Sequence, residues 1–228
     1  MDGYVSKNDV IPLKELFDEM LSSVRKDVKR EGITFTCNLV GSAKRNLVVC
    51  HPTKGIDCDY QLILQSNKNG LNESEIKRLF RLSFDRHRPT GFSPCEDSTS
   101  ALTRRTKDAK HSKILYSFDI VILQDMNGVP KIIRRTSEGE YVWNQLRSMA
   151  DFQQRFSMIS NSDMWDELRR RYYNKKVKQM NGETDKKSFQ LLNETVNEVI
   201  SLFYKQKTPP PCGEGENISI VRSDEFKH

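Results

Sequence analysis

The 228-residue sequence lacks any long hydrophobic run. Hydrophobic residues make up 36% of it, and no stretch approaches the roughly 18–20 apolar residues that a membrane-spanning helix requires. Residues 1–9 are polar and carry no apolar core of the kind found in secretory signal peptides. The sequence therefore predicts a cytoplasmic protein that does not contact membranes, and it leaves the oligomeric state open.

Recognisable cysteine patterns are also missing. The five cysteines are an odd number, and none of them forms a Cys-x-x-Cys pair. This argues against a disulfide framework and favours reduced thiols. The group formed by Cys50, His51 and Cys58 lacks a fourth ligand at zinc spacing, so we expect no structural zinc there.

Charge of one sign is in modest excess. The chain has 37 Lys and Arg residues against 31 Asp and Glu residues, which gives a formal net charge of +6. A basic balance favours anionic partners such as nucleotides, phosphates or nucleic acid. A solvated surface that is richer in Lys than in Glu is the alternative interpretation, and net charge does not decide between the two.

Hydrophobic periodicity divides the chain into a sheet-forming part and a helical part. Strand patterns occur at 33–40, 56–65, 114–123 and 129–133, and helical spacing of apolar residues occurs at 11–28 and 73–86. After residue 136, helical patterns occur at 141–149, 151–159, 164–180 and 187–204. The class is α+β: a mixed sheet with flanking helices, followed by a helical C-terminal half.

The segments between these patterns complete the layout. Pro12 suits the first turn of the first helix, residues 125–128 form a hairpin turn, and prolines at 209–211 end the last helix. The basic segment 104–113 has no periodicity and is interpreted as a charged loop or a surface for an acceptor or RNA. We expect a catalytic domain at 1–136, a helical domain at 137–208 and a flexible tail at 209–228, with a short strand at 218–221.

Two short motifs are the most informative about chemistry. Gly41 and Ser42 follow the predicted strand 33–40, and Asp57 and Asp59 stand at the start of the next strand. Residues two apart in a strand point to the same face, roughly 6–7 Å apart at Cα. Because two ionised carboxylates repel each other, this arrangement favours a cation between them.

A third carboxylate, Asp119, interrupts the otherwise apolar strand 114–123. A charge inside such a strand costs free energy unless it is paired or bound to a metal. Hard oxygen ligands without a histidine in the motif favour Mg²⁺ or Mn²⁺. The three acids together predict a site for two such ions.

Each of these residues also has a purely structural interpretation. Asp57 and Asp59 would then be surface acids of an edge strand, and Asp119 would pair with Arg134 or Arg135. The Gly-Ser dipeptide alone is more often a plain turn. Its position between two predicted strands is what gives it weight.

The pattern resembles the nucleotidyltransferase superfamily typified by DNA polymerase beta, poly(A) polymerases, oligoadenylate synthetases, cyclic dinucleotide synthases and aminoglycoside nucleotidyltransferases. Its members have a strand, Gly-Ser, a short connection, Asp-x-Asp on the next strand and a third Asp on a later strand. Gly41, Ser42, Asp57, Asp59 and Asp119 match this pattern position by position. The long segment between Asp59 and Asp119 is more similar to that of the oligoadenylate and cyclic dinucleotide synthases than to that of the smallest antitoxin-type members.

The resemblance implies an activity, its cofactors and its site residues. The enzyme would transfer NMP from an NTP to a hydroxyl of a nucleotide, RNA, small molecule or protein, and release pyrophosphate. The backbone amides of Gly41 and Ser42 and the serine hydroxyl would contact the triphosphate. Asp57 and Asp59 would hold both metal ions, and Asp119 would hold one and take the acceptor proton.

Several basic residues are candidates for contacts with phosphate. Lys44 and Arg45 follow the Gly-Ser motif and would bind phosphate or lie in a solvated loop. A basic helix face interleaved with tyrosines has the same two interpretations; it comprises Arg169, Arg170, Arg171, Lys175 and Lys176. The alternative function is a catalytically degenerate module of the same fold that binds nucleotide or RNA.

Overall fold

The computed structural model describes residues 3–49, 55–108 and 113–207. The predicted tail with its strand at 218–221, and residues 50–54 of the connection before Asp57, lie outside the described residues. The elements in chain order are α1 (Lys7–Arg30), β1 (Ile33–Val40), α2 (Gly41–Arg45), β2 (Ile56–Asn67), α3 (Glu73–Arg86), β3 (Glu96–Asp97), β4 (Ala101–Asp108), β5 (Lys113–Met126), β6 (Val129–Arg135), β7 (Tyr141–Gln145), α4 (Ala150–Ser160), α5 (Trp165–Met180) and α6 (Ser188–Lys207).

The first helix starts earlier than its apolar stripe predicts. The Ser6 side chain accepts a hydrogen bond from the Asp9 backbone N–H at 3.2 Å, and the Asp9 side chain accepts one from the Ser6 backbone N–H at 3.2 Å. This capping box satisfies two donors at the helix start and sets the beginning of α1 at Lys7. Pro12 therefore lies inside the helix, beyond its first turn, and the prediction that it occupies the first turn is wrong.

Seven strands form one mixed sheet, as predicted for the fold class. The main path runs β1-β2-β5-β4-β3, with β6 paired to β5 and β7 paired to β6. The β2–β5 pair is parallel and the other pairs are antiparallel. The turn predicted between β5 and β6 is present, and its Gly128 N–H donates to the Asp125 carboxylate at 2.7 Å. The long central strands β2 and β5 therefore lie side by side with their ends at the same edge.

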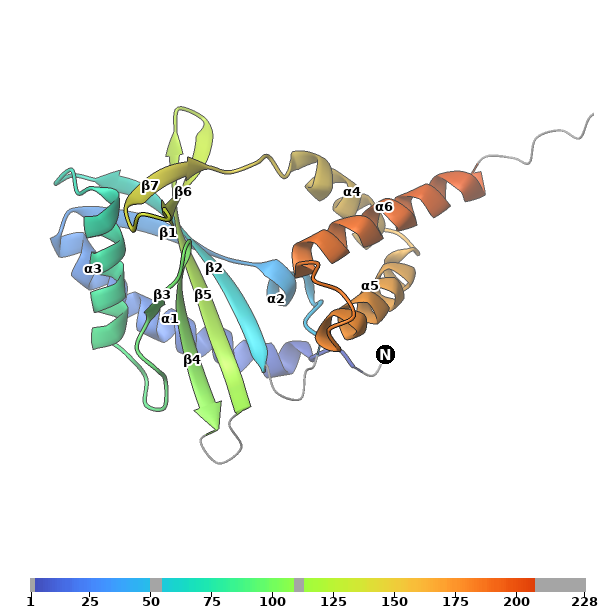
Figure 1. Cartoon of the computed structure of the whole chain (residues 1–228), viewed down its shortest axis with the longest axis horizontal. Helices are drawn as coiled ribbons and strands as arrows, with labels where there is room; N and C mark the ends of the chain where they lie inside the picture. Colours follow the sequence, from blue (N-terminus) through green and yellow to red (C-terminus); the bar gives the residue numbers. More distant parts are fainter. Residues whose placement is uncertain (1–2, 50–54, 109–112, 208–228) are drawn as a thin grey trace, which may run out of the picture. The chain divides into compact units, whose positions relative to one another are not determined.

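Helices α1 and α3 cover one face of this sheet (Figure 1). An aromatic cluster fills the space between them: the Phe17 ring stacks on Tyr60 with a centroid separation of 3.6 Å, and Phe118 meets Phe17 edge-on at 5.2 Å. Alternate residues of β2 on this side are buried, namely Cys58, Tyr60, Leu62 and Leu64. Because side chains alternate along a strand, the residues between them point to the opposite face, which carries Asp57 and Asp59.

Two segments differ in type from the prediction. Residues 104–108 of the basic segment predicted as a loop belong to β4, which lies between β5 and β3, and Arg104 is fully buried. The Arg104 guanidinium donates to Asp85 of α3 at 2.8 Å and to the Cys95 sulfur at 3.2 Å, so a partner distant in sequence makes burial of this charge possible. The helix predicted at 141–149 is the strand β7, which takes its backbone hydrogen bonds from β6.

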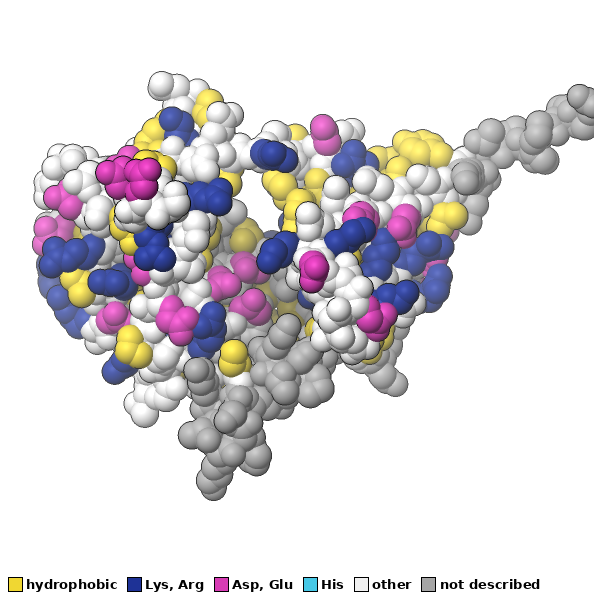
Figure 2. Space-filling model, viewed as in Figure 1, with side chains coloured by type: hydrophobic (Ala, Val, Ile, Leu, Met, Phe, Trp, Pro, Cys, Tyr) yellow, Lys and Arg dark blue, Asp and Glu magenta, His cyan; other side chains and the backbone are white. Residues whose placement is uncertain are grey.

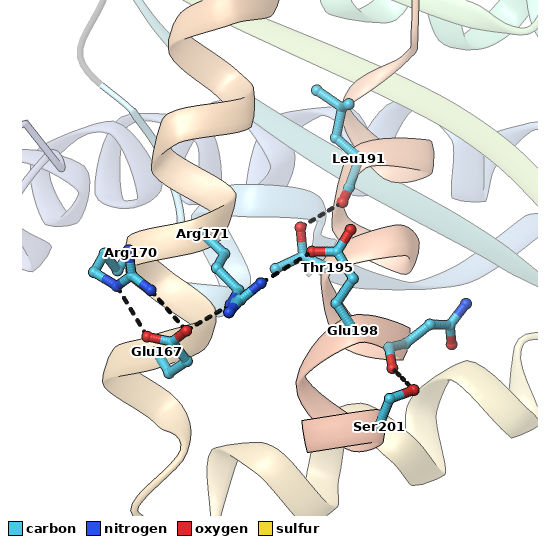
Figure 3. Close-up of polar contacts among 8 residues, drawn as sticks. Glu167, Arg170, Arg171, Leu191, Thr195, Glu198 and Ser201 are labelled. Carbon is cyan, nitrogen blue, oxygen red and sulfur yellow. Dashed lines mark hydrogen bonds and ion pairs between the residues drawn. The ribbon is translucent and has the colours of Figure 1, made fainter. Parts of the chain in front are cut away.

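The chain separates into two compact units. The first combines Met1–Met149 with Tyr173–Asp185 and contains the whole sheet, and the second combines Ala150–Tyr172 with the chain from Lys186 onward. Within the second unit, the Arg171 guanidinium reaches Glu198 of α6 at 3.7 Å and donates to Glu167 at 2.5 Å, and Arg170 also donates to Glu167 (Figure 3). None of the helices that the structure describes is both long enough and apolar enough to cross a membrane.

Candidate functional site

Three carboxylates meet on the open face of the sheet. Asp57 and Asp59 lie two apart on β2, and Asp59 stands directly opposite Asp119 in the parallel register of β2 with β5. One carboxylate oxygen from each of the three lies within 4.8 Å of the others. Figure 2 shows acidic side chains grouped over these strands. The structure therefore brings together the acids that the sequence separates by up to 62 positions.

The proton affinities of the acids reflect their crowding. Burial raises the pKa of Asp59 from 3.8 to about 7, and the neighbouring charges of Asp57 and Asp119 act in the same direction. The pKa of Asp57 is also raised, first by loss of solvation, although its hydrogen bond from Ser117 opposes the rise. Like charges directly opposite each other in a sheet are destabilising. The arrangement thus costs free energy in the absence of a cation.

Gly41 provides the space that the Asp59 side chain occupies. Its φ is +68°, a conformation that favours glycine. A Cβ at this position would lie 1.9 Å from Oδ2 of Asp59 and 2.8 Å from its Cγ. The glycine of the Gly-Ser motif is therefore required by direct contact with the second acid, in addition to its backbone conformation.

The remaining predicted residues lie on α2, the short helix that follows β1. Ser42 is partly buried, and its carbonyl accepts a hydrogen bond from Leu47 N–H at 3.0 Å. Arg45 donates to the Gly41 carbonyl at 3.0 Å, and its charge lowers the pKa of Asp59. Lys44 is exposed. The structure therefore places Arg45 within electrostatic reach of the acids and gives no such contact for Lys44.

Two hydroxyl groups that the sequence analysis did not consider contact the acids. Ser117 of β5 donates a hydrogen bond to Oδ1 of Asp57, and Thr103 of β4 donates one to Oδ1 of Asp119 at 2.5 Å. Within the described part of the chain, the structure shows no pairing of Asp119 with an arginine of β6, which was the structural interpretation of this residue. Ser117 lies two residues before Asp119 on the same strand face, a signal present in the sequence.

Two further cations lie close enough to affect Asp57. The charges of Arg105 on β4 and of Lys176 on α5 both lower the pKa of Asp57. Lys176 lies in the part of α5 that belongs to the first compact unit. Arg105 is held by an ion pair with Glu96, and Lys176 donates to Gln179 at 2.6 Å. Lys176 belongs to the basic helix face identified in the sequence, whereas Arg105 was placed in a loop because β4 was not recognised.

The chemistry of the donor set fits a divalent metal ion. All three candidate ligands are carboxylates, which are hard oxygen donors of the kind that Mg²⁺ and Mn²⁺ prefer. The hydroxyl donors occupy one oxygen each of Asp57 and Asp119. The second oxygen of each carboxylate has no side-chain partner among the residues that the structure describes, and is available to a cation.

Comparisons with known proteins give no match by sequence. No protein-family model matches the chain, and no curated protein does. Solved structures do match. Vibrio cholerae DncV cyclic AMP-GMP synthase in complex with nonhydrolyzable GTP has a TM-score of 0.63 and 13% identity, covering 87% of this chain and 69% of that one.

Two other matches are similar. DncV in complex with the linear intermediate 5′ pppA(3′,5′)pG gives a TM-score of 0.55 at 14% identity, over 80% of this chain and 52% of that one. Elizabethkingia meningoseptica CdnE cyclic dinucleotide synthase with GTP and Apcpp gives 0.53 at 13% identity, over 89% and 84%. In the first two matches found, the chain spans about half the length of DncV. These likenesses confirm the predicted nucleotidyltransferase fold.

Proposed function

We propose that this chain, which has the polymerase beta-like nucleotidyltransferase fold, transfers a nucleoside monophosphate from an NTP to a hydroxyl acceptor. The observation that carries the proposal is the cluster of Asp57, Asp59 and Asp119, with one oxygen from each within 4.8 Å of the others. Three clustered carboxylates destabilise the fold unless they serve a cation. Their place on neighbouring strands next to Gly41 is the arrangement that nucleotidyl transfer needs.

The reaction has a simple balance. The acceptor hydroxyl oxygen forms a bond to the α-phosphorus, the bond from that phosphorus to the bridging oxygen of the β-phosphate breaks, and pyrophosphate leaves. Two divalent cations held by Asp57, Asp59 and Asp119 would neutralise the triphosphate and lower the pKa of the acceptor hydroxyl. We assign the acceptor proton to the Asp119 carboxylate, reached directly or through a water molecule.

We assign binding of the triphosphate to α2 and its surroundings. The backbone amides of Gly41 and Ser42 and the Ser42 hydroxyl would donate to phosphate oxygens, and the missing Cβ at Gly41 allows close approach. Arg45 is fixed by its bond to the Gly41 carbonyl and would add a positive charge next to this segment. Lys44, exposed on the same helix, is a further candidate for contact with phosphate.

Positive charges beside Asp57 support binding of a second anionic reactant. Arg105 and Lys176 approach this acid from two different elements, and each lowers its pKa. The matched synthases were solved with nucleotides, among them GTP and a linear pppApG intermediate. We therefore propose a nucleotide hydroxyl as the acceptor, with Arg105 and Lys176 attracting its phosphates or those of the donor.

The alternative function, a module that only binds nucleotide or RNA, has less support. Without a cation, three carboxylates would repel phosphate groups, and a pure binding surface would gain nothing from them. The alternative also leaves the space at Gly41 and the donated hydroxyls of Ser117 and Thr103 without a purpose.

Incubation with nucleotides tests the proposal. The purified protein is given each α-³²P-labelled NTP, alone and with the other three NTPs, in the presence of Mg²⁺ or Mn²⁺, and the products are separated by chromatography. We expect a metal-dependent labelled product from at least one NTP.

The matched control is the double variant Asp57→Asn with Asp119→Asn, which keeps the side-chain size and removes two negative charges. It should make no product. If the wild type makes no product with any NTP and metal, the proposed function is wrong.

A further inference from the structure

We propose that Ser117 and Thr103 are positioning residues that fix two of the three metal-binding carboxylates through neutral hydrogen bonds. The inference rests on the proposed function, since it assigns these hydroxyls to the same metal centre. Ser117 donates to Oδ1 of Asp57, and Thr103 donates to Oδ1 of Asp119 at 2.5 Å. Both donors are buried, with 8% and 5% of their surface exposed.

Strand register places each donor beside its acid. Ser117 is the direct partner of Asp57 in the parallel pairing of β2 with β5, and Thr103 is the direct partner of Asp119 in the antiparallel pairing of β4 with β5. Directly opposed side chains on one face of a sheet lie within contact distance. Two donor–acceptor pairs, Ser117 with Asp57 and Thr103 with Asp119, therefore lie across three adjacent strands on the open face, and the backbone ladder fixes their positions.

The neutrality of the donors matters for a cation site. A lysine or arginine at either position would also hold its carboxylate, but it would cancel the negative charge that attracts the metal. A hydroxyl donates one hydrogen bond and leaves the carboxylate charged. It also occupies only one of the two oxygens, so Oδ2 of Asp57 and of Asp119 stays available.

The third acid is held in a different way. Among the described residues, no side chain donates a hydrogen bond to Asp59, whose carboxylate instead lies against Gly41 in the space of the missing Cβ. Van der Waals contact thus limits Asp59, while hydrogen bonds orient Asp57 and Asp119. Ordering all three before the metal arrives reduces the entropy lost on binding.

Mn²⁺ binding to the full chain without nucleotide tests the inference. The affinity is measured by electron paramagnetic resonance for Ser117→Ala and Thr103→Val, which remove the hydroxyl, and for Ser117→Thr and Thr103→Ser, which keep it. Loss of a hydrogen bond to a metal ligand typically weakens metal affinity roughly 10- to 100-fold. We expect a loss of at least about tenfold in the first pair and less than about threefold in the second.

The matched control is Thr106→Val on the same strand, because the Thr106 hydroxyl donates to the Gly91 carbonyl at 2.9 Å and not to an acid. It should bind Mn²⁺ as the wild type does. If Ser117→Ala does not fold, Ser117→Cys replaces it, since a thiol is a weak donor of similar size. Wild-type Mn²⁺ affinity in the hydroxyl-free variants, or in the cysteine variant that replaces one, overturns the inference.

The outcome is distinguishable from failure of the proposed function. A wild-type protein that binds Mn²⁺ but makes no nucleotide product would contradict nucleotidyl transfer, while weaker binding in the variants would still support the positioning role. A wild type that makes product, together with hydroxyl-free variants of unchanged Mn²⁺ affinity, would contradict only the positioning role. A wild type that does not bind Mn²⁺ without nucleotide would contradict the positioning role, and the incubation with nucleotides would decide separately on nucleotidyl transfer.

Discussion

Replacing Asp59 with asparagine should stabilise the protein when no metal is present. Burial and the charges of Asp57 and Asp119 raise the pKa of Asp59 from 3.8 to about 7. At about 1.4 kcal/mol for each tenfold change in proton affinity, ionised Asp59 at pH 8 costs the folded state at most about 4 kcal/mol. The asparagine amide also loses solvation, so we expect Asp59→Asn to raise the free energy of unfolding by about 1–3 kcal/mol.

The pH dependence follows from the same pKa. Because the folded-state pKa of Asp59 lies above the unfolded value, its contribution to stability is fully present below pH 3.8 and is lost as the pH rises through about 7. The wild type in EDTA should therefore lose stability between pH 5.5 and pH 8 relative to Asp59→Asn. Mn²⁺ at pH 8 should restore the stability of the wild type and have little effect on the variant.

Urea denaturation of both proteins in EDTA at pH 5.5 and pH 8, with and without excess Mn²⁺, measures these effects. A substitution with the opposite expected effect on stability is available at Gln61. This residue lies two positions after Asp59 on β2 and faces the same side of the sheet. Gln61→Glu extends the acidic cluster and should lower the stability in EDTA. A variant Asp59→Asn that is less stable than the wild type at pH 8 in EDTA would refute the argument from carboxylate repulsion.

Three other substitutions probe separate parts of the account. Gly41→Ala places a Cβ 1.9 Å from Oδ2 of Asp59 and should weaken Mn²⁺ binding at least about tenfold. The control is Gly70→Ala, because Gly70 has a similar φ of +65° and a Cβ there would have no atom within 4 Å. This control should cost only about 1–2 kcal/mol of stability and leave Mn²⁺ titrations unchanged. Asp85→Asn removes the charge paired with buried Arg104 and should lower the free energy of unfolding, measured by urea denaturation, by about 3 kcal/mol. Loss of the exposed ion pair in Arg170→Ala should change it much less. Lys176→Met should raise the NTP concentration for half-maximal rate about tenfold, and an unchanged value would remove this residue from the binding site.

Elements whose signals are local in sequence were predictable. The strand at Ile33–Val40 and the helix at Glu73–Arg86 have the predicted bounds. In the helix, Asn72 accepts from the Glu75 backbone N–H at 3.0 Å and Glu75 accepts from the Asn72 backbone N–H at 2.8 Å. Because such capping residues lie within four positions of each other, the start of the helix is predictable from local sequence alone.

Elements that depend on distant partners were not predictable. β4 has the sequence pattern of a charged loop because it contains charged residues such as Arg104. Arg104 is buried only through its ion pair with Asp85 of α3, and that pair exists only in the folded chain. β7 is a strand because β6 offers it a free edge and because the Tyr141 hydroxyl donates to Asp97. Hydrogen bonds of this kind override helical periodicity.

The same distinction between local signals and distant partners applies to the residues of the candidate site. Asp57 and Asp59 share a face because they are two apart on a strand, which is a local rule, and an analogous rule connects Ser117 with Asp119 on β5. Thr103 and Arg105 reach the acids only through the pairing of β4 with β5, so an error in one strand hid two residues of the site.

The central claim is that the three acids serve nucleotidyl transfer, and stoichiometry tests it most directly. Excess protein is mixed with limiting NTPs, all α-³²P-labelled to the same specific activity, and with Mg²⁺ or Mn²⁺, and both the new phosphodiester bonds in the labelled products and the pyrophosphate are quantified over time. We predict one pyrophosphate for each new bond in the wild type, and neither product nor pyrophosphate in the Asp57→Asn/Asp119→Asn variant. Equal product formation by the wild type and this variant, or no product under any condition, would contradict the claim.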